Sequence, residues 1–120
     1  MEALNKVELR GKVGEIRITQ VGNAKVANFS VCTNFSYTGK DGTKVIETCW
    51  HKVAVWANTD KQAEYIARIK PETPVFVSGR IKVRSYVRAD GAQTTIHEIV
   101  AQRVEILKEE ITPETEHRNS

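Results

Sequence analysis

Cysteine and histidine are scarce in this sequence of 120 residues. The two cysteines, Cys32 and Cys49, form no C-x-x-C pair, and the three histidines stand far apart. We therefore expect no metal site and no cofactor. Two cysteines would permit one disulfide, but a reducing compartment favours two buried thiols, which is the state we expect.

Long apolar runs and catalytic signatures are also missing. No segment approaches the roughly 20 apolar residues of a membrane-spanning helix, and residues 1–6 contain no apolar h-region. We expect a cytoplasmic protein without a signal peptide and without a membrane partner. Cys49 and His51 could suggest a thiol nucleophile, but strand positions of that parity face inward. No acidic cluster has the spacing of phosphoryl transfer, so we expect no enzyme.

The charge is unevenly distributed. The net charge is +3. Residues 109–120 hold four glutamates and one arginine, a net −3, so the remaining body carries +6. A basic body suits a polyanionic partner. We divide the chain into a domain over residues 1–108 and a short, polar, flexible tail over 109–120.

Alternation with period two dominates the domain and predicts strands. The predicted strands span residues 4–18, 25–35, 45–56, 74–88 and 94–107. One helix lies between the third and fourth strands, because Thr59 and Gln62 fit a capping box and Pro71 marks a stop. The order predicts an all-β fold, a five-stranded OB-fold barrel with one short helix. A five-stranded sheet with a flanking helix is the alternative, but the long first strand, interrupted at Gly11 and Gly14, favours the barrel.

The fourth predicted strand separates cations from apolar residues. One parity is apolar and predicts a core face, comprising Val75, Val77, Gly79, Ile81, Val83 and Val87. The other parity carries Arg80, Lys82, Arg84, Tyr86 and Arg88. A solvated edge strand protected by charge is the alternative interpretation. A cationic run without any acid instead favours a binding surface.

The third predicted strand repeats this pattern. Trp50, Lys52 and Trp56 share one parity, and the opposite parity makes the better core. Tyr37 leads into a hairpin that carries Lys40 and Lys44, while Lys6 and Arg10 share the polar face of the first strand. Rings that stack on unpaired bases and cations that track phosphates are what single-stranded nucleic acid requires. We therefore predict that the cations and aromatic residues of these strands contact single-stranded DNA: Lys6, Arg10, Tyr37, Lys40, Lys44, Trp50, Lys52, Trp56, Arg80, Lys82, Arg84, Tyr86 and Arg88.

Four segments together resemble the bacterial single-stranded DNA-binding protein family, over residues 5–107. They are Asn5–Gly14 (NKVELRGKVG), Val26–Thr33 (VANFSVCT), Trp50–Trp56 (WHKVAVW) and Val77–Tyr86 (VSGRIKVRSY). The resemblance implies an OB-fold that binds single-stranded DNA with little sequence preference during replication, recombination and repair. It also implies a homotetramer that wraps the strand and is associated with the nucleoid.

The resemblance assigns roles by position. Trp50 matches a base-stacking tryptophan, Tyr37 and Tyr86 match positions that are often tryptophan, and Trp56 replaces a stacking phenylalanine. Lys52, Lys82 and Arg84 match basic positions that contact the DNA backbone. His51 matches a position beside the subunit interface.

One feature of the family is missing. Members usually continue into a Gly/Pro/Gln-rich linker and an acidic tip that recruits replication and repair enzymes, whereas this sequence stops at Ser120. We expect no recruitment through such a tip. The alternatives are a primosomal OB-fold accessory protein, usually dimeric, an RNA-binding OB-fold, and a barrel that binds only proteins.

Overall fold

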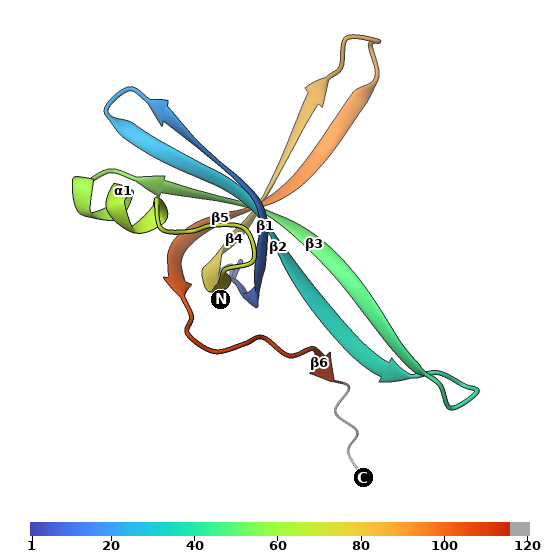
Figure 1. The fold of residues 1–120 in the computed structure, drawn as a ribbon. Helices are drawn as coiled ribbons and strands as arrows, with labels where there is room; N and C mark the ends of the chain where they lie inside the picture. The colour runs from blue at the N-terminus through green and yellow to red at the C-terminus, as the bar shows by residue number, and fades with distance from the viewer. Residues whose placement is uncertain (116–120) are drawn as a thin grey trace.

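The computed structural model describes residues 1–115 and shows long strands with one short helix (Figure 1). All five predicted long strands and the predicted helix are present, with ends shifted by a few residues. The elements are β1 (Val7–Val21), β2 (Ala24–Thr38), β3 (Lys44–Ala57), α1 (Asp60–Ile66), β4 (Pro74–Val87), β5 (Gln93–Ile106) and β6 (Glu114–Thr115).

The strands close into a barrel because β1 has two partners. Its first part, Val7–Lys12, pairs with β4, and its second part, Lys12–Val21, pairs with β2. The sheet order is β1-β4-β5-β3-β2-β6, and the β1–β2 pairing joins the two sides of the barrel. Gly11 lies at the change of partner, where a Cβ would collide with the carbonyl oxygen of Cys32. The predicted OB-fold barrel is confirmed.

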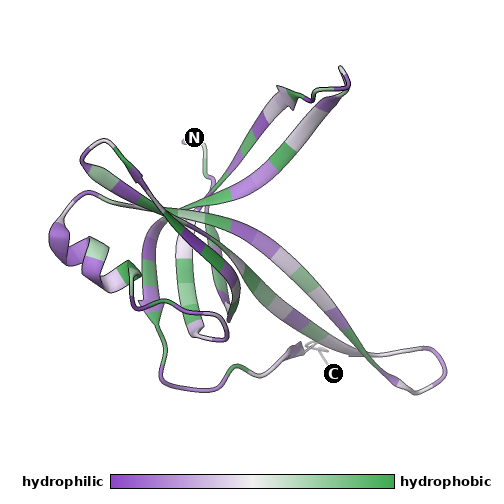
Figure 2. Cartoon of the chain, turned by 45° about the horizontal axis from the view of Figure 1, so that its top comes forward, coloured by the Kyte–Doolittle hydropathy of each residue, from purple (hydrophilic) through white to green (hydrophobic). Residues whose placement is uncertain are grey.

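The core consists of branched aliphatic side chains that alternate with polar ones along each strand (Figure 2). Val13, Val31, Val75 and Val77 are its largest fully buried side chains. Helix α1 adds Ile66 to the core. The predicted cap is present, since Gln62 N–H donates to Thr59 Oγ1 at 3.1 Å.

Three hairpins extend away from the barrel as two-stranded arms: β1–β2, β2–β3 and β4–β5 (Figure 1). The β4–β5 arm corrects one prediction. Ile81, Val83 and Val87 are 45%, 54% and 69% exposed, so they are not part of the core. The apolar parity of β4 is buried only up to Gly79, because beyond it the strand leaves the barrel and only β5 remains beside it.

The cysteines correct another prediction. Both thiols are free, as expected, but Cys49 is exposed and Cys32 only half-buried. Cys32 pairs with Trp50 and Cys49 with Thr33 in the β2–β3 register, which places the two thiols on opposite faces of the arm. The expectation of two buried thiols was wrong because β2 and β3 extend past the barrel at this point.

The segment after β5 runs back toward β2. Glu114–Thr115 forms β6, which pairs in parallel with Phe35 and Ser36. The domain boundary at residue 108 stays a prediction, and residues 116–120 of the predicted tail lie outside the described residues. Within residues 1–115, no helix is long and apolar enough to cross a membrane.

Candidate nucleic-acid interface

The two tryptophans lie on the outer surface of β3, as the alternation predicted. Trp50 and Trp56 are 59% and 46% exposed. Their Cα partners on β2 are Cys32 and Val26, and Ser30 lies opposite Lys52 between them. Two indole faces and one ammonium group are therefore presented to solvent along a single strand.

A β-bulge in β1 makes room for the Trp50 ring. Gly14 and Glu15 together face the single residue Ser30, and Glu15 N–H donates to Ser30 Oγ at 3.1 Å. A Cβ on Gly14 would lie 2.6 Å from Trp50 Cζ3. The indole thus lies across the backbone of β1, and only glycine permits this approach.

The β4–β5 arm carries the second group of cations. Arg80, Lys82, Arg84 and Tyr86 are exposed on one face of the arm, and their partners on β5 are Val100, Glu98, Ile96 and Thr94. Arg84 Nε lies 3.4 Å from Glu98 Oε1. The run of β4 cations without an acid is therefore interrupted in three dimensions by an acid from the neighbouring strand.

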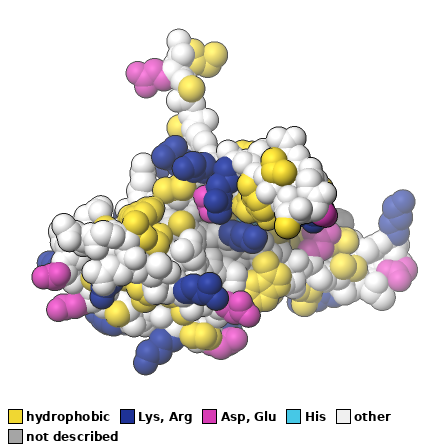
Figure 3. Space-filling model, turned by 90° about the horizontal axis from the view of Figure 1, so that it is seen from above, with side chains coloured by type: hydrophobic (Ala, Val, Ile, Leu, Met, Phe, Trp, Pro, Cys, Tyr) yellow, Lys and Arg dark blue, Asp and Glu magenta, His cyan; other side chains and the backbone are white. Residues whose placement is uncertain are grey.

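The parallel β3–β5 pairing joins these two surfaces. Ala54 pairs with Val100, and Val100 pairs with Arg80, so the outer side of β3 continues across β5 onto β4. Two strand spacings separate β3 from β4, about 10 Å. We call this surface the cationic–aromatic face; it consists of Trp50, Lys52, Trp56, Arg80, Lys82, Arg84 and Tyr86. Seen from above, Lys and Arg side chains lie around a hollow with hydrophobic side chains beside them (Figure 3).

The predicted residues of the β2–β3 arm lie further away. Lys40 and Lys44 are exposed at its hairpin. Tyr37 pairs with Val45 and is half-buried, with its ring centroid 6.2 Å from that of Phe35. Its parity is opposite to that of Trp50, so Tyr37 and Trp50 lie on different faces of the arm.

Three further predicted cations already have partners. Lys6 Nζ lies 2.9 Å from Glu8 Oε1, and this contact raises the pKa of Lys6. The Arg10 guanidinium lies 5.8 Å from the centroid of the Phe76 ring. Arg88 stands just after β4, in the turn, and pairs with Asp90 at 3.3 Å. Their DNA contacts stay predictions.

Two cations of β1 were missed by the sequence analysis. Lys12 is the Cα partner of Cys32, the partner of Trp50, which gives it the outward parity of Trp50, and it also lines the groove around His51. Arg17 pairs with Asn28, the partner of Ala54, and so also points outward. Uninterrupted alternation along β1 would place Lys12 and Arg17 on opposite faces of the strand. Lys12 precedes the bulge and shares the face of Arg10; the bulge at Gly14 and Glu15 reverses the parity for Arg17, and Gly14 was its only signal in the sequence.

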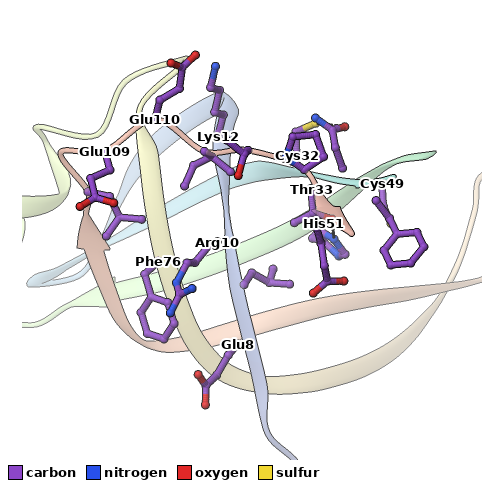
Figure 4. A pocket seen from close by; sticks show the side chains of 18 of the residues that line it. Glu8, Arg10, Lys12, Cys32, Thr33, Cys49, His51, Phe76, Glu109 and Glu110 are labelled. Atoms are coloured by element: carbon purple, nitrogen blue, oxygen red, sulfur yellow. Dashed lines mark hydrogen bonds between the residues drawn. The ribbon is translucent and has the colours of Figure 1, made fainter. Parts of the chain in front are cut away.

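His51 lies in a groove on another side of the molecule. The groove of about 1150 Å³ is lined by residues of β1, β2 and β3, by Phe76 of β4 and by residues 107–115 (Figure 4). His51 Nε2 lies 2.9 Å from Thr33 Oγ1, and burial lowers the pKa of the imidazole. Within residues 1–115, no three His, Cys, Asp or Glu side chains are arranged to hold a metal ion. The groove excludes both tryptophans, so its location gives it no part in the cationic–aromatic face.

Comparison with known proteins agrees with this geometry. The model of the single-strand binding protein family matches residues 4–107. The chain belongs to this family. A single-stranded DNA-binding protein of Neisseria meningitidis serogroup A is 36% identical over 109 residues, which cover 88% of this chain and 60% of the relative. One from Halalkalibacterium halodurans is 34% identical, over 88% of this chain and 61% of the relative. The chain thus spans about 60% of the length of these curated relatives.

Solved structures show the same fold. The chain is similar to the Plasmodium falciparum SSB in its complex with ssDNA, with a TM-score of 0.78 and 26% identity over 90% of this chain and 98% of that one. A deletion mutant of the Thermus aquaticus single-stranded DNA binding protein has a TM-score of 0.72 at 17% identity, over 88% of this chain and 51% of that one. The resemblance inferred from the four segments is confirmed.

Proposed function

We propose that this member of the single-strand binding protein family binds single-stranded DNA on the cationic–aromatic face. The observation that carries the proposal is the β3–β5 pairing, which joins the exposed rings of β3 to the cations of β4 in one surface. The ssDNA complex of the Plasmodium falciparum protein, a structural neighbour of this chain, supports the assignment.

The side chains of the cationic–aromatic face determine how far it can distinguish one base sequence from another. Stacking on Trp50, Trp56 or Tyr86 is worth about 1–3 kcal/mol per base and accepts every base. Lys52, Lys82 and Arg84 would neutralise phosphates and release condensed counterions. Such a surface binds without much sequence preference, which suits a protein that covers single strands during replication, recombination and repair.

Assembly belongs to the same proposal. We infer a homotetramer, with His51 beside a subunit contact, located with the nucleoid in the cytoplasm. The exposed lining of the groove around His51 supports an interface there. Light scattering on the full chain at micromolar concentration tests this inference. A tetramer supports it, and a dimer favours a primosomal accessory protein instead.

The binding proposal is tested by titrating the tryptophan fluorescence of the full chain with oligo-dT at several salt concentrations. We expect strong quenching and an affinity that falls with salt. Oligo-rU of equal length distinguishes DNA from RNA, and tighter binding of the RNA would favour the RNA-binding alternative. Unchanged emission at saturating oligo-dT would overturn the stacking assignment.

A further inference from the structure

The cationic–aromatic face contains one carboxylate that its proposed role does not require. Glu98 projects from β5 between the strands that carry the cations. Lys82 is its Cα partner on β4, and Arg84 Nε lies 3.4 Å from its Oε1. Lys52 stands on β3 one residue before Val53, and Glu98 stands on β5 one residue before Ile99, the partner of Val53. One acid therefore contacts Arg84, lies opposite Lys82 and stands at the same level of the sheet as Lys52, and all three cations are proposed to contact phosphate.

The position of Glu98 is built into the fold. Its side chain is 17% exposed, against 58% for Arg84. A carboxylate this covered requires a counter-charge, and Arg84 supplies it. In the register of β5, Glu98 shares its parity with Val100 and Ile96, the partners of Arg80 and Arg84, so the strand presents its carboxylate on the same face as these cations.

We propose that Glu98 is an internal competitor for phosphate, which weakens DNA binding and lowers the number of phosphates that the face neutralises. This inference rests on the proposed function. A phosphate that binds Arg84 approaches the carboxylate on the same face, so it must either displace Glu98 or accept its repulsion. The face thus holds single strands less tightly than its cations alone would, which keeps the complex reversible.

Coulomb's law sets the size of the effect. Two unit charges about 7 Å apart change a Kd by about threefold in water, and by tens of fold at the effective dielectric constant of a protein surface. We expect Glu98→Gln to bind oligo-dT about three- to thirtyfold more tightly at low salt. The slope of log affinity against log salt should steepen by up to about 0.7, the value of one added phosphate contact on a single strand. Glutamine preserves the shape of the side chain, so the strand pairing should be retained.

The experiment compares the wild-type chain, Glu98→Gln and Glu64→Gln in titrations with oligo-dT across a series of salt concentrations. Glu64 is exposed on α1, and its substitution makes the same change in net charge. Glu64→Gln should behave as the wild type does. A gain for Glu98→Gln alone, with the steeper slope, supports the inference. An equal gain in both variants would reduce the effect to net charge and overturn it.

A double-mutant cycle identifies the partner of Glu98. The gain from Glu98→Gln should shrink when Arg84 is replaced by alanine, because the competition then has one cation fewer. If Glu98→Gln binds oligo-dT as the wild type does, or more weakly, Glu98 is not a competitor and this inference is wrong. The proposed function still stands in that case, provided that the wild type binds oligo-dT in a salt-sensitive way. Absence of binding by the wild type would instead overturn the proposed function and this inference with it.

Discussion

Gly14→Ala should separate the stacking site from the stability of the barrel. The new Cβ would lie 2.6 Å from Trp50 Cζ3 and 2.5 Å from Ser30 Oγ. Ordinary carbon contacts are about 3.5–4.0 Å, so a shift of roughly 1 Å is required. Trp50 is exposed and free to turn, whereas Ser30 is held against β1 by its bond from Glu15 N–H. The indole should therefore rotate away from β1.

The two consequences differ in size. Strain or loss of the Ser30 bond should cost stability by about 0.5–1.5 kcal/mol. Loss of stacking at Trp50 should weaken oligo-dT binding by about 1–3 kcal/mol, roughly 5- to 150-fold in Kd. The salt dependence should stay unchanged, because no cation is removed.

Fluorescence titration with oligo-dT gives the affinity, and thermal melting gives the stability. Gly39→Ala is the matched control, since its Cβ would meet only ordinary or slightly tight contacts of 3.3–3.5 Å. The control should keep wild-type binding. Wild-type affinity and wild-type emission in Gly14→Ala would show that the Trp50 ring does not depend on the bulge for its position.

Three further perturbations test other parts of the structure. Lys82→Ala and Arg84→Ala should each reduce the slope of log affinity against log salt for oligo-dT by about 0.7, whereas Trp50→Ala should lower the affinity and leave the slope unchanged. If all three variants have the same slope, the β4 cations serve only to keep the protein soluble. Lys12→Ala and Arg17→Ala should weaken binding and flatten the slope, whereas Lys61→Ala on α1 should do neither. Equal effects at all three sites would exclude Lys12 and Arg17 as DNA contacts. Because burial holds the pKa of His51 below its ordinary 6.5, the unfolded chain binds the proton more tightly than the folded one. The free energy of unfolding should therefore fall as pH drops below about 6.5. Urea melts of His51→Gln should lack the part of this decrease that His51 causes. The same pH dependence in the wild type and in His51→Gln would exclude His51 as its source.

The fold could be predicted from the sequence because each strand has a clear local signal. Period-two alternation identified all five long strands, and Thr59, Gln62 and Pro71 bracketed the helix. The arms were less predictable. Ile81 and Val83 have the same parity and chemistry as the buried Val75 and Val77, yet they are exposed. Alternation reports which residues share a face, but the extent of the barrel decides whether anything covers that face.

The site was predictable where one strand contains all of it. Trp50 and Trp56 project outward as their parity indicated, and the four β4 side chains share one face. Arg17 was missed because a bulge changes parity without changing composition, whereas Lys12 lies before the bulge and shares the polar face of Arg10 by simple alternation. The position of Glu98 follows from the unbroken hairpin register that runs from Val87↔Gln93 to Gly79↔Ala101, but alternation along β4 alone could not reveal an acid contributed by the neighbouring strand.

The decisive contact for the proposed function is also the one least visible in the sequence. Only three parallel pairs, from Val53–Ile99 to Val55–Ala101, join β3 to β5. Nearly fifty residues separate these segments, and neither has a motif that identifies the other as its partner. Without this pairing, the tryptophans and the β4 cations would belong to separate hairpins. A DNA strand stacked on the tryptophans would then gain no affinity from the β4 cations. Because the pairing fixes Ala54 of β3 and Arg80 of β4 about two strand spacings apart, a DNA strand stacked at β3 can extend its neighbouring phosphates toward β4. Affinity at this face is therefore expected to depend jointly on both strands, so that Trp50→Ala and Lys82→Ala together should show coupling rather than simple additivity.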